Sequence, residues 1–429
     1  MKPEFVISCP IDTYSGYGAR SRDVVKAIIE TNKYNVKIMP QRWGNTPWNF
    51  IKDHKEWHFL QSHLLPQGAP LKSRPKIWAQ ITVPNEFQPV GEYNIGITAG
   101  IETTVAAAPW IEGMNRMNLN LVSSQHAKDV FLNSKFEQRE QQTDRLIKTI
   151  EVTKPIEVLF EGVNLETYFP HKSNFNLDQI EENFAYLFVG HWMNGKIGED
   201  RKNVGLLVQS FYETFKNKKK TPALILKTSI AGASYKSREE IIRRINSIKS
   251  TIPNAKTLPN VYLLHGEISD KEMNELYNHK KIKAMVSLTK GEGYGRPLAE
   301  FSITKKPIIT TKWSGHLDFL NPEFTTLIHG DLKQVDKSAA VKDVILPESS
   351  WFSPSVGEFQ YYLKDCFENY KEYKEKGTRQ AYHIKSEFSY QKMFEKLNAL
   401  LTNAIPDFPT TVKLELPKLD LPKKEPANA

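Results

Sequence analysis

The chain has 429 residues, of which 40% are hydrophobic and 25% charged, and its formal net charge is +9 at pH 7. These values exclude a fibrous or wholly disordered protein, and the length predicts two domains, because one core seldom serves more than roughly 250–300 residues. The positive charge favours anionic partners in general: nucleotide phosphates, nucleic acid or an acidic membrane face. Cys9 and Cys366 form no zinc-binding pattern, and no run approaches the roughly 18 apolar residues of a membrane span. We therefore expect a cytoplasmic protein without an integral membrane segment.

The first part of the chain alternates short apolar runs with helical patterns. A buried strand, a glycine loop, a helix and a second strand open it, and Ser123 or Ser124 is placed to cap a later helix. The expected strands lie at 4–10, 34–40, 76–83, 93–100, 119–124 and 155–163, and the expected helices at 22–30 and 125–134. This order predicts a parallel sheet flanked by helices.

A second series of strands and helices alternates strictly from 184 to 311. Both halves therefore read as open parallel sheets, whose ligands bind at the carboxyl ends of the strands. A helix over 359–377 is expected to end at Gly377 as a C-cap. The expected divisions are an N-terminal domain at 1–167, a linker at 168–183, a C-terminal domain at 184–356, helices at 357–404 and a flexible tail at 405–429.

The stretch "GEGYGRPLAE" joins a predicted strand to a predicted helix and carries two carboxylates, Glu292 and Glu300. Its glycines let a ligand approach the backbone, and free amides at a helix start attract phosphate. Carboxylates beside an anion site can accept hydrogen bonds from sugar hydroxyls, so the pattern predicts a nucleotide-sugar site. The alternative is a helix cap with two solvated glutamates.

The longer stretch "GEGYGRPLAEFSITKKPIITT" resembles the signature of retaining family 4 glycosyltransferases of GT-B fold, and the first half of the chain most resembles bacteriophage-type members. The resemblance implies two Rossmann-like domains that face each other across a cleft, with C-terminal helices crossing back to the first. It also implies that Glu292 contacts the donor sugar, that Glu300 contacts the ribose hydroxyls, and that the loop amides of Gly293, Tyr294 and Gly295 lie near the diphosphate.

The segment "VGHWMNGKIGEDRKNVGLLVQSF" is similar to the first strand and basic loop of the family's C-terminal domain. The similarity implies that Arg201 and Lys202 hold the diphosphate, with Lys196 as a competitor for one of these roles. A cationic pair at a helix N-terminus is unfavourable, so a bound anion would give it a reason. The alternative is a solvated helix start. Gly315 and His316 match a family loop near the donor sugar.

A related tripeptide occurs early, at Gly16, Tyr17 and Gly18, between the first strand and the first helix. A dinucleotide site does not fit, because Ser21 occupies the third glycine position and the second strand ends in "MPQR" without an acid. In the glycosyltransferase interpretation this loop faces the donor diphosphate across the cleft, and Arg20 and Arg22 add positive field. A tight strand-to-helix turn is the alternative.

The stretch "NIGITAGIETTVAAAPWIEGM" resembles the acceptor-domain segment of some of these enzymes. By that resemblance Glu102 lies near the anomeric carbon. His126, at the second position of a predicted helix, is the other candidate, although a histidine there is often structural.

The family's activity is the transfer of a hexosyl or pentosyl group with retention, here from a UDP-linked donor. Stabilising the departing diphosphate is the main catalytic demand, and because the chain has no Asp-x-Asp sequence we expect cations rather than a metal to meet it. No further cofactor is expected. The acceptor would be a glycan or another hydroxyl compound. Two alternatives remain: a phage enzyme that glycosylates a hydroxylated DNA base in the host cytoplasm, and a non-catalytic module that binds nucleotide-sugars or DNA.

Overall fold

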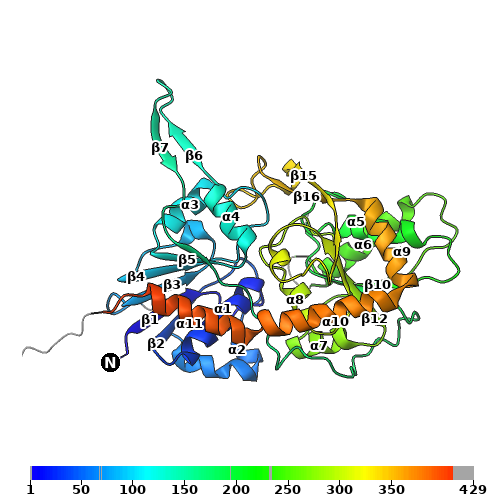
Figure 1. Cartoon of the computed structure of the whole chain (residues 1–429), viewed down its shortest axis with the longest axis horizontal. Helices are drawn as coiled ribbons and strands as arrows, with labels where there is room; N and C mark the ends of the chain where they lie inside the picture. The colour runs from blue at the N-terminus through cyan, green and yellow to red at the C-terminus, as the bar shows by residue number, and fades with distance from the viewer. Residues whose placement is uncertain (1, 67, 69, 194, 231–233, 409–429) are drawn as a thin grey trace, which may run out of the picture.

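The computed structural model describes residues 2–66, 68, 70–193, 195–230 and 234–408. In these residues two six-stranded parallel sheets, each flanked by helices, form the centres of two domains that lie side by side (Figure 1). The expected fold class, a GT-B arrangement of two Rossmann-like domains, is therefore confirmed.

The first sheet has the strand order β2-β1-β3-β4-β5-β8. Its strands are nearly continuous apolar runs, as parallel strands covered on both faces require. Helix α1 is capped by Ser15, whose side chain accepts from the Gly18 amide, and it buries Val24, Val25 and Ile28 against the sheet. The elements of this domain are β1 (Glu4–Cys9), α1 (Gly16–Glu30), β2 (Asn35–Pro40), α2 (Phe50–Asp53), β3 (Ile77–Ile81), β4 (Tyr93–Ile97), α3 (Ala108–Asn115), β5 (Leu119–Val122), α4 (Gln125–Asn133), β6 (Phe136–Arg139), β7 (Leu146–Ile150) and β8 (Ile156–Val158), with 3₁₀ helices η1 (Lys55–His63) and η2 (Pro84–Glu86).

The second sheet has the strand order β11-β10-β9-β12-β13-β14. Successive strands are added in one direction from β9 to β11 and in the opposite direction from β12 to β14, so the order of strand addition reverses between β9 and β12. Ligands of such sheets bind at this reversal, outside the carboxyl ends of the strands. The elements are β9 (Ala185–Val189), α5 (Val204–Phe215), β10 (Ala223–Lys227), α6 (Tyr235–Thr251), β11 (Val261–Leu264), α7 (Asp270–Asn278), β12 (Ile282–Val286), α8 (Arg296–Ser302), β13 (Ile308–Thr311), β14 (Thr326–Ile328), β15 (Gly330–Gln334) and β16 (Ser350–Pro354), with 3₁₀ helices η3 (Gly315–Asp318) and η4 (Lys337–Ala339).

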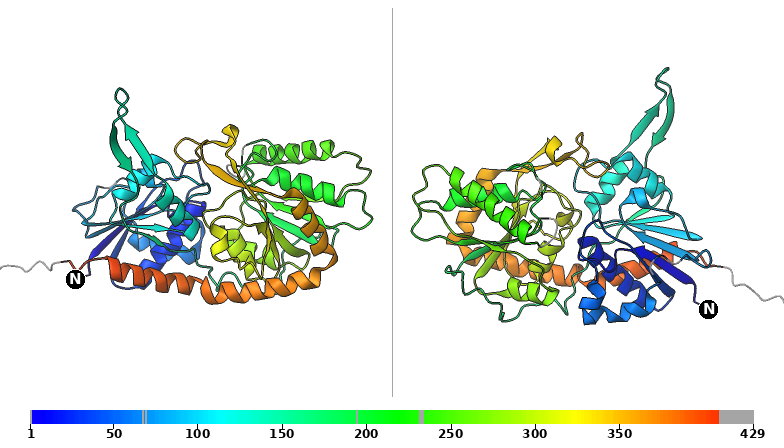
Figure 2. Two further views of the ribbon diagram at one scale, coloured as in Figure 1. Left: turned by 45° about the horizontal axis from the view of Figure 1, so that its top comes forward. Right: turned by 180° about the vertical axis from the view of Figure 1, so that it is seen from behind.

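Three C-terminal helices, α9 (Val356–Glu368), α10 (Tyr370–Glu387) and α11 (Tyr390–Ala404), return the chain to the first domain. Figure 2 shows α10 along the second domain and α11 along the first. Lys33, just after α1, donates to Asn398 and Thr402 of α11, both at 2.8 Å. The expected crossing back is confirmed.

The sequence prediction for Gly377 was wrong. Helix α10 continues through this position to Glu387, and Gly377 is buried where the helix crosses the backbone of Lys306 and Pro307. A Cβ there would lie 2.5 Å from the Lys306 carbonyl carbon. The glycine is therefore explained by close packing and not by a helix end.

Other expectations have mixed outcomes. Ser124, rather than Ser123, caps α4, since its Oγ accepts from the Ala127 amide. The two hairpins, β6 with β7 and β15 with β16, were not foreseen. The domain divisions stay a prediction, and most of the expected flexible tail, 409–429, lies outside the described residues. Within the described part of the chain, no helix is both long enough and apolar enough to span a membrane.

The two helical glycines Gly377 and Gly357 make a matched pair of stability tests. Gly to Ala within a helix ordinarily stabilises by up to about 1 kcal/mol. We expect Gly357→Ala in α9 to follow this rule, because a Cβ there meets nothing within 4 Å. Gly377→Ala should instead destabilise by about 1–3 kcal/mol through overpacking. Thermal and urea unfolding measure both, and an equal or greater stability of the Gly377 variant would contradict the packing argument.

Candidate active site

The loops that follow β9 and β12 flank the reversal in the second sheet, and both carry charge. Residues 190–203 join β9 to α5, and residues 287–295 join β12 to α8. From the first domain, the loop after β4 faces them through Ala99 and Glu102. All three loops leave the carboxyl ends of their strands, where the fold predicts a ligand.

Four charged side chains meet between these loops. Lys202 Nζ lies 2.6 Å from Glu292 Oε1, and Arg201 Nη1 lies 3.4 Å from Glu292 Oε2. Arg201 also reaches across to the first domain, where its Nη2 is 3.6 Å from Glu102 Oε1. The structure thus brings together the three residues predicted for the donor and one predicted for the reacting centre.

Burial and charge compete at Glu292. Burial alone would raise the pKa of its carboxyl, but Lys202 and Arg201 outweigh burial and lower the pKa to about 2. Burial in turn lowers the pKa of the Lys202 amine, although Glu292 opposes this. Glu292 is therefore ionised across the physiological range and holds two cations in fixed positions.

Two glycines allow the second domain to touch the first. A Cβ at Gly291 would overlap the carbonyl oxygen of Glu102, and one at Gly293 would overlap that of Ala99. Hydrogen bonds also join the two domains at this interface. Ser123 Oγ donates to the Gly293 carbonyl at 3.0 Å, and the backbone amide of Gln125 donates to Asp318 Oδ2 at 2.8 Å. The two domains are in direct contact around the charged cluster.

The glycine loop at Gly16–Gly18 approaches the loop that contains Gly293 through Ala99. The hydroxyl of Tyr17 lies 2.9 Å from Thr98 Oγ1 and accepts from the Ala99 amide at 3.2 Å, and Ala99 in turn faces Gly293. Gly16 begins α1 with open space around it, whereas a Cβ at Gly18 would overlap the carbonyl oxygen of Thr13. Gly18 therefore also has a local packing role.

Arg20 and Arg22, which were expected to add positive field to the cleft, are both buried in the first domain. Arg20 is fully buried and donates to the carbonyls of Leu159 and Phe160. Arg22 donates to two backbone carbonyls of the loop after β1 and stacks 3.4 Å from the Phe50 ring centroid. Both guanidinium groups fix backbone segments of the first domain.

Glu300 is buried beside Arg296, a residue that the sequence analysis did not single out. Arg296 Nε lies 2.8 Å from Glu300 Oε1, while its Nη1 lies 2.5 Å from Asp23 and 3.7 Å from Glu161 in the first domain. Burial raises the pKa of Glu300 to about 7, because one guanidinium shared by three carboxyls does not offset the loss of water. The four-residue spacing of Arg296 and Glu300 on a helix was the available signal.

Tyr294 and the two histidines occupy the edges of this region. The Tyr294 ring is buried against Phe319, with ring centroids 4.8 Å apart. His126 is the second residue of α4, as expected, and its ring lies edge-to-face with that of Trp313, with ring centroids 4.7 Å apart. Burial lowers its pKa to about 4. His316 is buried and donates from Nε2 to the Thr311 carbonyl at 2.7 Å. Burial lowers the pKa of His316 as well, so both histidines are neutral at pH 7.

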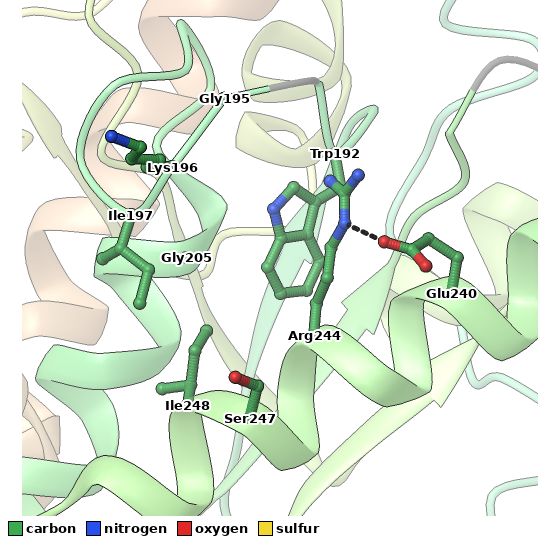
Figure 3. Close-up of a pocket in the computed structure, with 9 residues that line it drawn as sticks. All are labelled: Trp192, Gly195, Lys196, Ile197, Gly205, Glu240, Arg244, Ser247 and Ile248. Carbon is green, nitrogen blue, oxygen red and sulfur yellow. Dashed lines mark hydrogen bonds and ion pairs between the residues drawn. The ribbon is translucent and has the colours of Figure 1, made fainter.

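Lys196 lines a separate cavity of about 320 Å³ between the 192–197 loop, α5 and α6 (Figure 3). There Arg244 lies alongside Trp192 and pairs with Glu240 at 3.0 Å. Arg201 and Lys202, and not Lys196, are the residues in contact with Glu292.

No protein-family model matches the chain, and no curated protein matches it in sequence. Its fold is similar to a glycosyltransferase from Rickettsia africae, with a TM-score of 0.62 and 12% identity over 95% of this chain and 100% of that one. It is similar to HepE of Anabaena in complex with UDP and glucose, with a TM-score of 0.59 and 11% identity over 94% and 100%. It is also similar to sucrose-phosphate synthase from Thermosynechococcus elongatus, with a TM-score of 0.58 and 12% identity over 94% and 99%. At these identities the comparisons establish the fold.

The raised pKa of Glu300 makes a prediction about stability. The folded protein favours the neutral carboxyl, whose ordinary pKa is 4.5, so this contribution is complete below 4.5 and is lost as the pH rises through about 7. Relative to Glu300→Gln, the free energy of unfolding of the natural protein should therefore fall between these values and level off above them. Thermal unfolding of both proteins over this range measures the difference. A difference that is constant or increases with pH would show that burial does not dominate.

The glycine contact makes a prediction about domain closure. Gly293→Ala should hold the domains apart, because its Cβ would overlap the Ala99 carbonyl oxygen. We expect a larger radius of gyration in small-angle X-ray scattering and faster amide exchange around Ala99. Gly16→Ala is the control, since a Cβ there meets nothing within 4 Å. Equal scattering from both variants would mean that closure does not require this contact.

Proposed function

We propose that this protein is a glycosyltransferase that moves a hexosyl or pentosyl group from a UDP-linked donor to an acceptor hydroxyl. The observation that carries the proposal is the cluster of Glu292, Arg201 and Lys202 at the reversal of the second sheet, closed off by Glu102 from the first domain. The solved complexes of the structurally similar HepE with UDP and with UDP-glucose support it.

The donor would lie along the loops of the second domain. Arg201 and Lys202 would pair with the diphosphate, together with the amides of Gly293, Tyr294 and Gly295. For Tyr294 we assign the backbone amide, because the ring is buried against Phe319. Glu292 would accept hydrogen bonds from the sugar hydroxyls and Glu300 from the ribose hydroxyls. Gly16, Tyr17 and Gly18 would cover the diphosphate from the first domain.

These residues would act by stabilising the negative charge of the departing diphosphate. As the bond from the sugar to the diphosphate lengthens, negative charge gathers on the leaving oxygens, and two fixed cations stabilise it without reorganising. Glu102 would lie at the reacting carbon, and neutral His126 would be the other candidate for contact with the acceptor hydroxyl. Transfer with retention, independence of metal ions and the absence of a further cofactor belong to the proposal, as does a location in the cytoplasm.

The acceptor we propose is a glycan or another hydroxyl compound bound by the first domain. Beside Tyr17 its loops offer Trp43, stacked on that ring with centroids 4.0 Å apart. Three interpretations stay predictions: DNA modification, closeness to bacteriophage enzymes and membership of the retaining family 4. Acceptor assays with duplex DNA and with glycans would separate DNA modification from transfer to a glycan. A non-catalytic module would bind the donor without turning it over.

A panel of nucleotide-sugars tests the donor site directly. A true donor should stabilise the protein in a thermal-shift assay, by about 2.7 kcal/mol at a hundredfold excess over Kd. Glu292→Gln and Lys202→Gln should lower the rate of nucleotide release from that donor by about 10²–10³-fold, the usual cost of losing a charge-stabilising group. Lys196→Gln is the matched control and should leave the rate unchanged. Unchanged turnover in the Glu292 and Lys202 variants would refute the catalytic proposal.

A further inference from the structure

The hairpin of β6 and β7 stands away from the rest of the protein in each view (Figures 1 and 2). Its strands pair with each other and, among the described residues, with no other strand. Every residue from 137 to 149 is exposed. A two-stranded hairpin is marginally stable alone in water, and a free strand edge presents unpaired N–H and C=O groups to another chain. This hairpin is therefore a candidate for an interaction with a partner.

The direction of the backbone groups along β6 can be worked out from the turn. The Glu140 amide donates to the Arg145 carbonyl, and the Asp144 amide donates to the Glu140 carbonyl, both at 2.9 Å, so Glu140 turns both groups toward β7. Alternate residues of an antiparallel strand turn to opposite edges. Gln138 therefore also faces β7, and Glu137 and Arg139 turn their backbone groups to the free edge. The register between β6 and β7 shifts at a bulge between Gln138 and Arg139, but the bulge does not alter these directions along β6, since the extra residue, Ile147, lies in β7.

Within one chain Arg139 pairs with Glu137 at 2.7 Å and with Asp144 at 3.3 Å. The charges on that edge are also self-complementary between two copies. If two β6 strands pair antiparallel about a two-fold axis through Gln138, Glu137 of each copy lies opposite Arg139 of the other. These are the residues with free backbone groups, so the same register forms backbone hydrogen bonds and two cross-strand pairs of opposite charge. A two-fold axis through Glu137 or through Arg139 would instead place that residue opposite its own copy, so that like charges would face each other. The strand β7 contains no acidic residue to offer such a pattern.

We propose that the free edge of β6 is a self-association surface, on which a second copy of this chain pairs to form a four-stranded sheet β7-β6-β6-β7. The hairpin projects from the first domain in both views of Figure 2, and its residues 137–149 are exposed to a second copy. One short edge buries far less than the roughly 1,200 Å² of a stable interface, so the association is weak and depends on concentration. It does not rest on the proposed transfer activity.

Charge exchange tests the register. In sedimentation equilibrium up to about 0.5 mM protein, the natural chain should show a monomer–dimer equilibrium that weakens as salt is added. Glu137→Arg and Arg139→Glu each place like charges at both symmetric positions, and we expect each to raise Kd about tenfold or more. The double variant restores opposite charges and should recover the natural Kd. A mixture of the two single variants should associate as a heterodimer.

Other outcomes would overturn the proposal. These are a natural chain that stays monomeric throughout, single variants that associate as tightly as the natural chain, or a double variant that fails to recover. All changed side chains are exposed, so equal thermal midpoints and circular dichroism spectra confirm that each variant is folded.

Discussion

The arrangement of the site depends on one steric constraint: two backbones, one from each domain, meet where no Cβ fits. Gly291 and Gly293 lie against the carbonyl oxygens of Glu102 and Ala99, and only this approach brings Arg201 within reach of a carboxylate in each domain. A bulkier residue in the loop would separate the charges that the fold otherwise aligns. The electrostatics of the site therefore follow from a packing feature.

Charge is shared unequally on the two sides of this contact. Around Glu292, two cations face one fully ionised carboxylate, with Glu102 at the margin. Around Glu300, one guanidinium serves three carboxyls, two of them from the other domain. The first group is suited to receive an anion, because its two cations lie close to backbone amides and can exchange their carboxylate partners for it. The second joins the domains, because Arg296 satisfies carboxylates from both.

Local patterns in the sequence predicted the alternation of strands and helices well. They also predicted the placement of Glu292 in a loop between a strand and a helix, whereas Arg201 and Lys202 were singled out by the family resemblance. Features that depend on distant partners were not predictable in this way. Arg20 looked like a cleft cation until the carbonyls of Leu159 and Phe160 were seen beside it, and Gly377 looked like a helix end until α10 was seen crossing Pro307. The role of Arg296 required knowing that Asp23, far away in the sequence, lies next to it.

The return of α11 to the first domain has a consequence for how the protein is made. Met393, Leu397 and Leu401 of this helix are buried in the core that also contains Val24 and Ile28 of α1. The first domain is thus built from both ends of the described chain. During synthesis on the ribosome its core stays incomplete while the whole second domain emerges, and a chain that stops before α11 leaves an apolar face of α1 open to chaperones and proteases. Emergence of α11 from the ribosome is therefore itself a folding step, and it favours survival of molecules that contain this helix.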